Sequence, residues 1–239
     1  MQSSHRTGGQ GSCFGMNAPA QGSVEWLAQR AGHCTASRFK DVLAKIKSGE
    51  ASTRRNYRVQ LVTERLTGIP CETFKNAAME WGTTMEPAAR DEYEAITGEL
   101  VEAAPFLLHP EIKWCGGSPD GLVGDDGLIE IKCPHQSTVH VETLQSGMPR
   151  EHMAQCQGVM LVTGRKWVDF VSFDPRMPEH LRVYQERIKR DDSYIETLQA
   201  EVCAFLNEVE ALYLKLMDRN TLLDKLVASI PANSPATQP

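Results

Sequence analysis

Residues 117–134 constrain the fold more than any other part of this chain. Their sequence, GSPDGLVGDDGLIEIKCP, has apolar residues on both sides of Gly-Asp-Asp-Gly, a run typical of a tight turn. The pattern predicts a β-hairpin. Because side chains alternate between the two faces of a strand, Glu130 and Lys132 share one face of the second strand, and Ile129 and Ile131 point to the other.

Asp120 lies at the start of this hairpin, which folds it back towards Glu130. Two carboxylates and a lysine that converge on a sheet are typical of a site for a hard divalent cation, beside a group that handles a proton of water. A buried carboxylate pair needs a cation to offset its repulsion and desolvation. The alternative is a solvated ion pair of small energetic value. The apolar neighbours of these residues favour the metal site.

A third acid, Glu86, lies in a helix predicted over residues 77–98, with Gly98 as its C-cap. The apolar stripe of this helix consists of Met85, Ala89, Tyr93 and Ile96. Glu86 lies one step round from that stripe. There it is either a plain surface residue or a third acid that supports Asp120 and Glu130.

No apolar run reaches the roughly 20 residues of a membrane helix, and no signal-peptide region opens the chain, so we expect no membrane partner. The seven cysteines are scattered without a Cys-x-x-Cys pair, which favours reduced thiols in a cytoplasm. A zinc site built from His33, Cys34, Cys133 and His135 fits no standard ligand spacing.

The formal charge of −6 is unusual for a protein that binds nucleic acid, but the charge is unevenly distributed. Between residues 23 and 70, nine Lys and Arg accompany four acids, which makes this segment +5 and the remainder −11. Local basic clustering is the feature that matters for phosphate contact. The other interpretation is that these residues form solvated helix faces.

Apolar spacing predicts an α/β fold with an N-terminal helical layer. Helices are expected over residues 24–30, 35–46, 53–66, 77–98, 138–144 and 150–162, and strands over 100–102, 106–108, 112–115, 117–134, 167–173 and 181–184. We expect a single domain (23–230) between a disordered leader (1–22) and a disordered tail (231–239). The domain is expected to consist of a helical DNA-contacting layer (23–98), a catalytic α/β core (99–187) and a C-terminal helix (190–230). The heptad-like apolar seam of that last helix indicates packing against the chain's own body, or a coiled-coil contact between copies.

Six short blocks together carry a resemblance to a known family. They are residues 30–37 (RAGHCTAS), 81–86 (WGTTME), 118–122 (SPDGL), 128–134 (LIEIKCP), 152–157 (HMAQCQ) and 173–177 (FDPRM). In this order they resemble the phage-type alkaline exonucleases, also called lambda exonuclease or YqaJ-like viral recombinases, of the PD-(D/E)XK nuclease superfamily. The resemblance covers residues 25–187. It implies a restriction-endonuclease-like core, in which helices flank a central mixed β-sheet.

The resemblance also implies a catalytic centre. Asp120, Glu130 and the main-chain carbonyl of Ile131 would hold Mg²⁺, with two ions per site and Mn²⁺ as a possible substitute. Lys132 would orient the attacking water and help to deprotonate it. Glu86 and Gln157 would position the water and the metal.

The resemblance further implies how DNA is held. Arg30, Ser37 and Ser118 would bind the 5′-terminal phosphate, Met79 would be the wedge that splits terminal base pairs, and Lys47 would contact DNA. The family digests one strand of linear duplex DNA from 5′ to 3′ and releases mononucleotides. It acts as a toroidal homotrimer in the bacterial cytoplasm, with a single-strand annealing protein as its partner in recombination.

Two alternatives remain at this stage. A RecB-type or restriction-like nuclease would use the same metal chemistry with another polarity or at internal sites. A catalytically inactive module that binds DNA ends would act through its C-terminal helix. Arg30 and its block favour end recognition over the first, and the complete set of Asp120, Glu130 and Lys132 disfavours the second.

Overall fold

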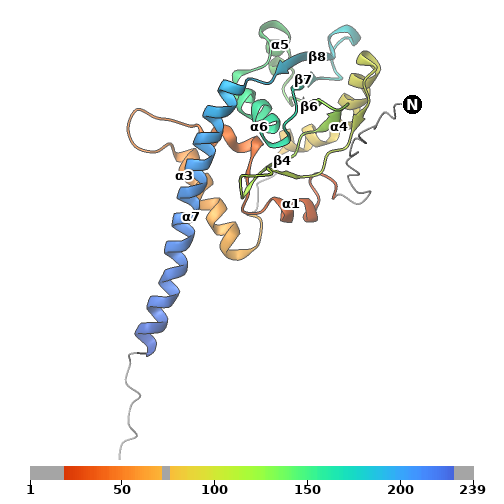
Figure 1. Ribbon diagram of the computed structural model, residues 1–239. Helices are drawn as coiled ribbons and strands as arrows, with labels where there is room; N and C mark the ends of the chain where they lie inside the picture. The colour runs from red at the N-terminus through yellow and green to blue at the C-terminus, as the bar shows by residue number, and fades with distance from the viewer. Residues whose placement is uncertain (1–18, 72–75, 229–239) are drawn as a thin grey trace, which may run out of the picture.

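The structure, a computed structural model, describes residues 19–71 and 76–228 (Figure 1). Most of the expected leader and the whole expected tail therefore lie outside the described residues. The helices are α1 (Val24–Arg30), α2 (Phe39–Val42), α3 (Ser52–Thr67), α4 (Ala77–Thr97), α5 (Ser137–Ser146), α6 (Met153–Thr163) and α7 (Asp192–Ala228). The strands are β1 (Cys34–Thr35), β2 (Val101–Glu102), β3 (Leu107–Leu108), β4 (Cys115–Gly117), β5 (Gly121–Val123), β6 (Gly127–Lys132), β7 (Trp167–Phe173) and β8 (Val183–Lys189).

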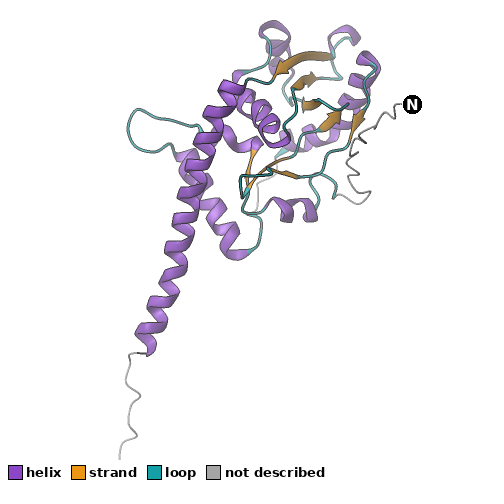
Figure 2. Ribbon diagram, viewed as in Figure 1, coloured by secondary structure: helices purple, strands orange, loops and turns teal. Residues whose placement is uncertain are grey.

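Strand β6 is the middle strand of a five-stranded mixed sheet with the order β2-β5-β6-β7-β8. It pairs antiparallel with β5 across the predicted hairpin turn, and parallel with β7. At Gly127 an added Cβ would lie 2.1 Å from the Trp167 ring, so only glycine lets the two strands pair in this register. A smaller three-stranded sheet, β1-β4-β3, lies beside it (Figure 2). The predicted mixed α/β fold is confirmed.

The two faces of β6 pack into different cores. Leu128 belongs to the larger core, which it shares with residues of α6 and α7. Ile129 and Ile131 belong to a second core, together with Ala89 and Tyr93 of α4. The predicted alternation is therefore confirmed, and it leaves Glu130 on the face that α6 covers.

Helix α7 packs along α3 and then runs away from the body of the protein (Figures 1 and 2). The first residues of its apolar seam are buried against that body, namely Ile195, Leu198, Val202, Phe205 and Val209. Packing against the chain's own body is therefore the confirmed interpretation for this part of the seam. None of the helices that the structure describes is both long and apolar enough to cross a membrane.

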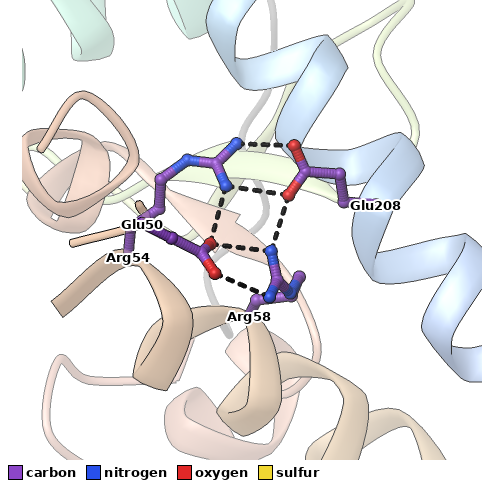
Figure 3. A network of polar contacts seen from close by, with 4 residues as sticks. All are labelled: Glu50, Arg54, Arg58 and Glu208. Carbon is purple, nitrogen blue, oxygen red and sulfur yellow. Dashed lines mark hydrogen bonds and ion pairs between the residues drawn. The ribbon is translucent and has the colours of Figure 1, made fainter. Parts of the chain in front are cut away.

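Helices α3 and α7 are joined by four charged residues, Glu50, Arg54, Arg58 and Glu208, which we call the α3–α7 network (Figure 3). Each arginine contacts both glutamates, at 2.7 or 2.8 Å. Three further cations of the basic segment have their own acids, in the pairs Arg38–Asp41, Lys45–Glu201 and Arg65–Glu210. Five of the nine basic residues in this segment therefore neutralise acids of this chain, which leaves fewer free cations for contact with phosphates.

Several element boundaries also differ from those predicted. The helix expected to reach Ile46 ends at Val42, because Phe39 and Val42 already fill the core and Ile46 is exposed. The last strand is β8, which runs to Lys189 instead of ending at residue 184. It is an edge strand with mostly polar residues, so the apolar pattern did not reveal its length. In α4, Ile96 is exposed, while Ala89 and Tyr93 are buried as predicted.

Candidate active site

A cavity of 420 Å³ opens where α1, α4, α6 and β6 meet; we call it the site cavity. Its walls are formed by Gln21, Trp26, Arg30, Ser37, Ala78, Met79, Gly82, Glu86, Ser118, Asp120, Glu130, Ile131, Lys132, Cys133 and Gln155. Nine of the eleven residues singled out in the sequence therefore line one space. The two others, Lys47 and Gln157, do not line it.

Glu130 is fully buried at the floor of this cavity. Its Oε1 accepts hydrogen bonds from Lys132 Nζ and, at 2.5 Å, from Gln155 Nε2. Its other oxygen, Oε2, is buried without any hydrogen-bond partner in the structure. An unpaired buried carboxylate oxygen is costly, so this atom is available for a ligand that carries positive charge.

Asp120 and Glu86 lie beside Glu130 and are linked through Arg90. The backbone N–H of Ile131 donates to Asp120 Oδ2 at 2.7 Å, which fixes this carboxylate against β6. Arg90 donates to the main-chain oxygen of Asp120 at 2.8 Å and to Glu86 Oε1 at 3.3 Å. Helix α4, the hairpin and β6 thus each supply one acid to the same wall.

The pKa values of these acids show that negative charge is in excess here. Burial raises the pKa of Glu130 to about 8 against the opposing effect of Lys132, and Asp120 and Glu86 add to the rise. Burial and Asp120 raise the pKa of Glu86 to about 7. Burial also raises the pKa of Asp120. Burial lowers the pKa of Lys132, but Glu130 and Asp120 outweigh it and the net shift is upward, so the ammonium stays charged.

These residues fit a hard divalent cation. Among the residues that the structure describes, no three His, Cys, Asp or Glu side chains are gathered closely enough to hold a metal ion alone. The oxygen atoms that could hold it are those of Asp120 and the unpaired oxygen of Glu130, and Ile131 also lines the cavity. An oxygen set of this size suits Mg²⁺, which binds one or two carboxylates and keeps several waters.

Arg30 also lines the site cavity, and three hydroxyl groups surround its guanidinium. It donates to Ser118 Oγ at 3.2 Å, Ser37 Oγ at 3.3 Å and Thr35 Oγ1 at 3.4 Å, and it stacks on the Trp26 ring at 4.1 Å. It forms no ion pair with any described residue. Burial lowers its pKa, which reflects a charge held partly out of water. A cation ringed by hydroxyls and without a carboxylate is suited to bind an anion.

Gln157 is not where the sequence analysis placed it. Its Nε2 donates to the carbonyl of Lys189 at 2.9 Å, and its Oε1 accepts from the N–H of Asp191 at 3.0 Å, so it joins α6 to the start of α7. Residues two apart on a helix differ by about 200° in direction, so Gln155 points to the site cavity when Gln157 points away. In the structure the glutamine that contacts Glu130 is Gln155, and Gln157, which was expected to position the water and the metal, does not line the site cavity.

Met79 lines the site cavity from the first turn of α4, and 48% of its surface is exposed. Lys47 is exposed in the loop between α2 and α3, outside the cavity. The sequence analysis missed Thr35 and Arg90. Thr35 lies inside the block that contains Ser37, and Arg90 follows Glu86 by one helical turn, so spacing could have found both.

Comparisons with known proteins agree with this geometry. The YqaJ-like viral recombinase domain matches residues 25–166. The alkaline exonuclease LHK-Exo of Laribacter hongkongensis, solved in complex with dAMP, is 46% identical, with a TM-score of 0.79. The match covers 84% of this chain and 100% of that one, and a second LHK-Exo structure gives a TM-score of 0.77.

A phage-related exonuclease from Haemophilus somnus 129PT shares the fold at 16% identity, with a TM-score of 0.59 over 77% of this chain and 96% of that one. None of the curated proteins compared with the chain matches it. The domain match spans more than half of the chain, and the LHK-Exo match spans most of it. The chain therefore belongs to the YqaJ-like viral recombinase family and is a phage-type alkaline exonuclease, a nuclease that acts on DNA.

Proposed function

We propose that this chain is a Mg²⁺-dependent exonuclease that digests one strand of linear duplex DNA from its 5′-phosphorylated end. It releases mononucleotides and leaves a 3′ single strand for annealing-type recombination. One observation carries the proposal. The anion site at Arg30 and the acidic site at Asp120, Glu130 and Lys132 open into the same cavity. A strand whose end is held at the first site presents its nearest phosphodiester to the second.

The Arg30 wall would recognise the terminal phosphate. A 5′-phosphate carries more negative charge than an internal phosphodiester, so it gains more from a partly buried guanidinium. Ser37, Ser118 and Thr35 already point their hydroxyls at this group, which keeps the pocket ordered before the substrate arrives. A 5′-hydroxyl end lacks the charge and would bind weakly.

The acidic wall would perform the hydrolysis. Exonucleases of this family generally use divalent metal ions. Asp120, Glu130 and the Ile131 carbonyl would hold Mg²⁺, which when bound stabilises charge on the attacking and leaving oxygens. Lys132, which donates to Glu130, would orient the attacking water and offset negative charge beside the metal. Gln155 fixes the Glu130 carboxylate, and Glu86 positions water at the edge of the site.

The proposal includes the assembly. A toroidal homotrimer around the duplex would let an acidic protein stay on DNA by enclosing it, and a single-strand annealing protein in the bacterial cytoplasm would receive the 3′ strand. The net charge of −6 and the internal pairing of five of the nine basic residues in segment 23–70 support enclosure over tight surface binding. A monomeric mass in solution would contradict this part of the proposal.

The test is digestion of a linear duplex with one 5′-phosphate and one 5′-hydroxyl end, with Mg²⁺. We expect loss of the phosphorylated strand from its 5′ end, and no cleavage by Lys132→Ala. Arg30→Gln should remove the preference for the phosphorylated end, by about tenfold or more, because a hydrogen bond to a charged group contributes roughly 1.5–3 kcal/mol. Opposite polarity, or nicking of circular DNA, would favour a RecB-type or restriction-like nuclease. No cleavage by the wild type would leave a DNA-end-binding module.

A further inference from the structure

A second, smaller cavity of 160 Å³ adjoins the site cavity; we call it the side cavity. It is lined by Ser37, Lys40, Lys132, Glu151, His152 and Gln155. Three of these residues, Ser37, Lys132 and Gln155, also line the site cavity, so they form the wall between the two. Arg30 and Ser118, which define the anion site, do not reach it.

Lys40 brings a free cation to this cavity. Of the nine basic residues in the segment 23–70, five form ion pairs within the chain. Lys40 forms none with any described residue. Three other basic residues of the segment also form no ion pair with any described residue. They are Arg30, which lies at the anion site, and Lys47 and Arg55, which line neither cavity. Lys40 is therefore the one basic residue of this segment that faces the side cavity without a partner among the described residues.

Two lysines and one acid line the side cavity, and Lys132 is already paired with Glu130. His152 stacks on Phe170 at 5.3 Å and has only a distant contact, 3.8 Å, with Glu151. Burial lowers the pKa of His152 to about 4, and both Lys132 and Lys40 contribute to the lowering, against Glu151. The ring is thus neutral near pH 7 and feels the positive charge of two lysines. Glu151 is largely exposed, so water screens its charge.

We propose that Lys40 and His152 form a phosphate subsite for the strand that is being digested, on the 3′ side of the scissile bond. The inference rests on the proposed function and deepens it. The terminal phosphate is assigned to Arg30, and the scissile phosphate to the acidic wall. Every other phosphate of that strand lies 3′ of the scissile bond. A lysine ammonium and a neutral imidazole N–H beside Lys132 are suited to hold the next one.

The subsite has a mechanical consequence. A strand held only at its terminal phosphate can pivot about that point, whereas a second contact beyond the scissile bond adds binding free energy and keeps the strand in the cavity. Lys40 would therefore act before the chemical step, by holding the strand. Its loss should raise KM more than it lowers kcat.

The experiment compares wild type, Lys40→Ala, Lys40→Arg and Arg55→Ala on 5′-phosphorylated duplexes. Arg55→Ala is the matched control, because it removes an exposed cation of the same segment that forms no ion pair with any described residue and lines neither cavity. Each duplex carries one uncharged methylphosphonate at the first, second or third linkage 3′ of the scissile bond. The rate of the first cleavage is measured for every pairing of enzyme and duplex.

We expect wild type and Arg55→Ala to lose about fivefold in rate when one particular linkage is uncharged. Lys40→Ala should already show that loss on ordinary DNA and lose nothing further at that linkage, because the two changes remove the same contact. Lys40→Arg should keep most of the rate. In salt titrations, Lys40→Ala should lower the slope of log kcat/KM against log salt by about one, and Arg55→Ala should not.

Two outcomes would overturn the assignment. If the rate loss caused by Lys40→Ala multiplies with the rate loss caused by the uncharged linkage at every one of the three positions, the two changes act independently. Lys40 then does not contact the strand. If the linkages have no effect and Lys40→Ala instead relieves inhibition by inorganic phosphate or dAMP, the subsite binds free phosphate compounds and not the strand. Failure of the wild type to digest any duplex would overturn the proposed function itself, which separates the two tests.

Discussion

Two clusters of charged side chains in this chain have opposite balances. In the α3–α7 network, two arginines face two glutamates, and every pair lies within 2.8 Å (Figure 3). In the site cavity, three carboxylates share one lysine and Arg90, their pKa values are raised, and one oxygen of Glu130 has no partner. The charges of the first cluster balance within the chain, whereas the described residues leave the second with an excess of negative charge.

The balance of charge within each cluster distinguishes a structural cluster from a functional one. The amino-acid composition cannot make this distinction, because both clusters contain acidic and basic residues. A balanced network stabilises the contact between two helices and has little to offer a substrate. An unbalanced cluster costs stability in the free protein, and that cost is recovered when a cation binds. We therefore expect mutations in the site cavity to lower activity more than stability, and mutations in the α3–α7 network to lower stability more than activity.

The largest expected effect concerns Asp120→Asn. Loss of one of the two carboxylates that we propose as metal ligands should lower exonuclease activity by about 10³-fold. The asparagine oxygen can still accept the bond from Ile131, and one negative charge leaves the cluster, so the metal-free variant should melt no lower than wild type at pH 8. Calorimetry and a digestion assay on the same preparation check both parts. A large fall in Tm would mean that Asp120 is structural and would weaken the contrast.

A smaller effect is expected from pH on the metal-free chain. Glu86 and Glu130 have folded pKa values of about 7 and about 8, above their ordinary values, so each carboxyl binds its proton more tightly in the folded state. Their contribution to stability is complete below about pH 4 and is lost as the pH rises through 7 and 8. We expect Tm to fall by roughly 5 °C between pH 5 and 8. Mg²⁺ should restore it at pH 8 and have less effect at pH 5.

Glu86→Gln provides the control for this titration. It removes one of the two groups, so its Tm should depend less steeply on pH than that of wild type. A variant of the α3–α7 network should keep the wild-type slope, because its charges are already paired. Equal slopes for Glu86→Gln and wild type would show that Glu86 is not part of the unbalanced cluster.

The smallest effect is expected for Glu208→Ala, which leaves Arg54 and Arg58 with Glu50 alone. The network is partly exposed, so the loss should be about 1 kcal/mol, or about 3 °C in Tm. Glu196→Ala is the control, since this glutamate is exposed on the same helix and forms no ion pair with any described residue. The rate of digestion at 25 °C should stay within about twofold of wild type for both variants, since neither touches the site cavity. A tenfold loss of activity in Glu208→Ala alone would show that the network does more than hold α7.

The local parts of this fold could be predicted from the sequence. Alternation placed Glu130 and Lys132 on one face of β6, apolar spacing gave β7 at its observed bounds, and Gly98 ends α4 in a left-handed conformation. Each of these rests on neighbouring residues, where the period of the side chains is fixed by the backbone. Asp120, Glu130 and Lys132 could be placed close together because all three belong to one hairpin, in which the backbone fixes the direction of each side chain.

Long-range contacts could not be predicted in this way. The pairing of Arg54 and Arg58 with Glu208 joins residues about 150 positions apart, and no local pattern indicates it. The choice between Gln155 and Gln157 depends on the rotation of α6, which is buried on nearly every side and so lacks a polar face to show its orientation. The length of β8 was hidden because an edge strand needs few apolar residues.

The parallel pairing of β6 with β7 has a consequence for synthesis. A ribosome that has added Lys132 has made both members of the Glu-x-Lys pair, yet one edge of β6 stays open until Trp167–Phe173 emerges. Helix α6, which supplies Gln155 and covers Glu130, is also made in that interval. The nascent polypeptide therefore carries the motif well before it can hold the carboxylates in place. A product terminated before residue 153 would contain Glu130 and Lys132 but would lack both α6 and β7, which pack against them in the whole chain.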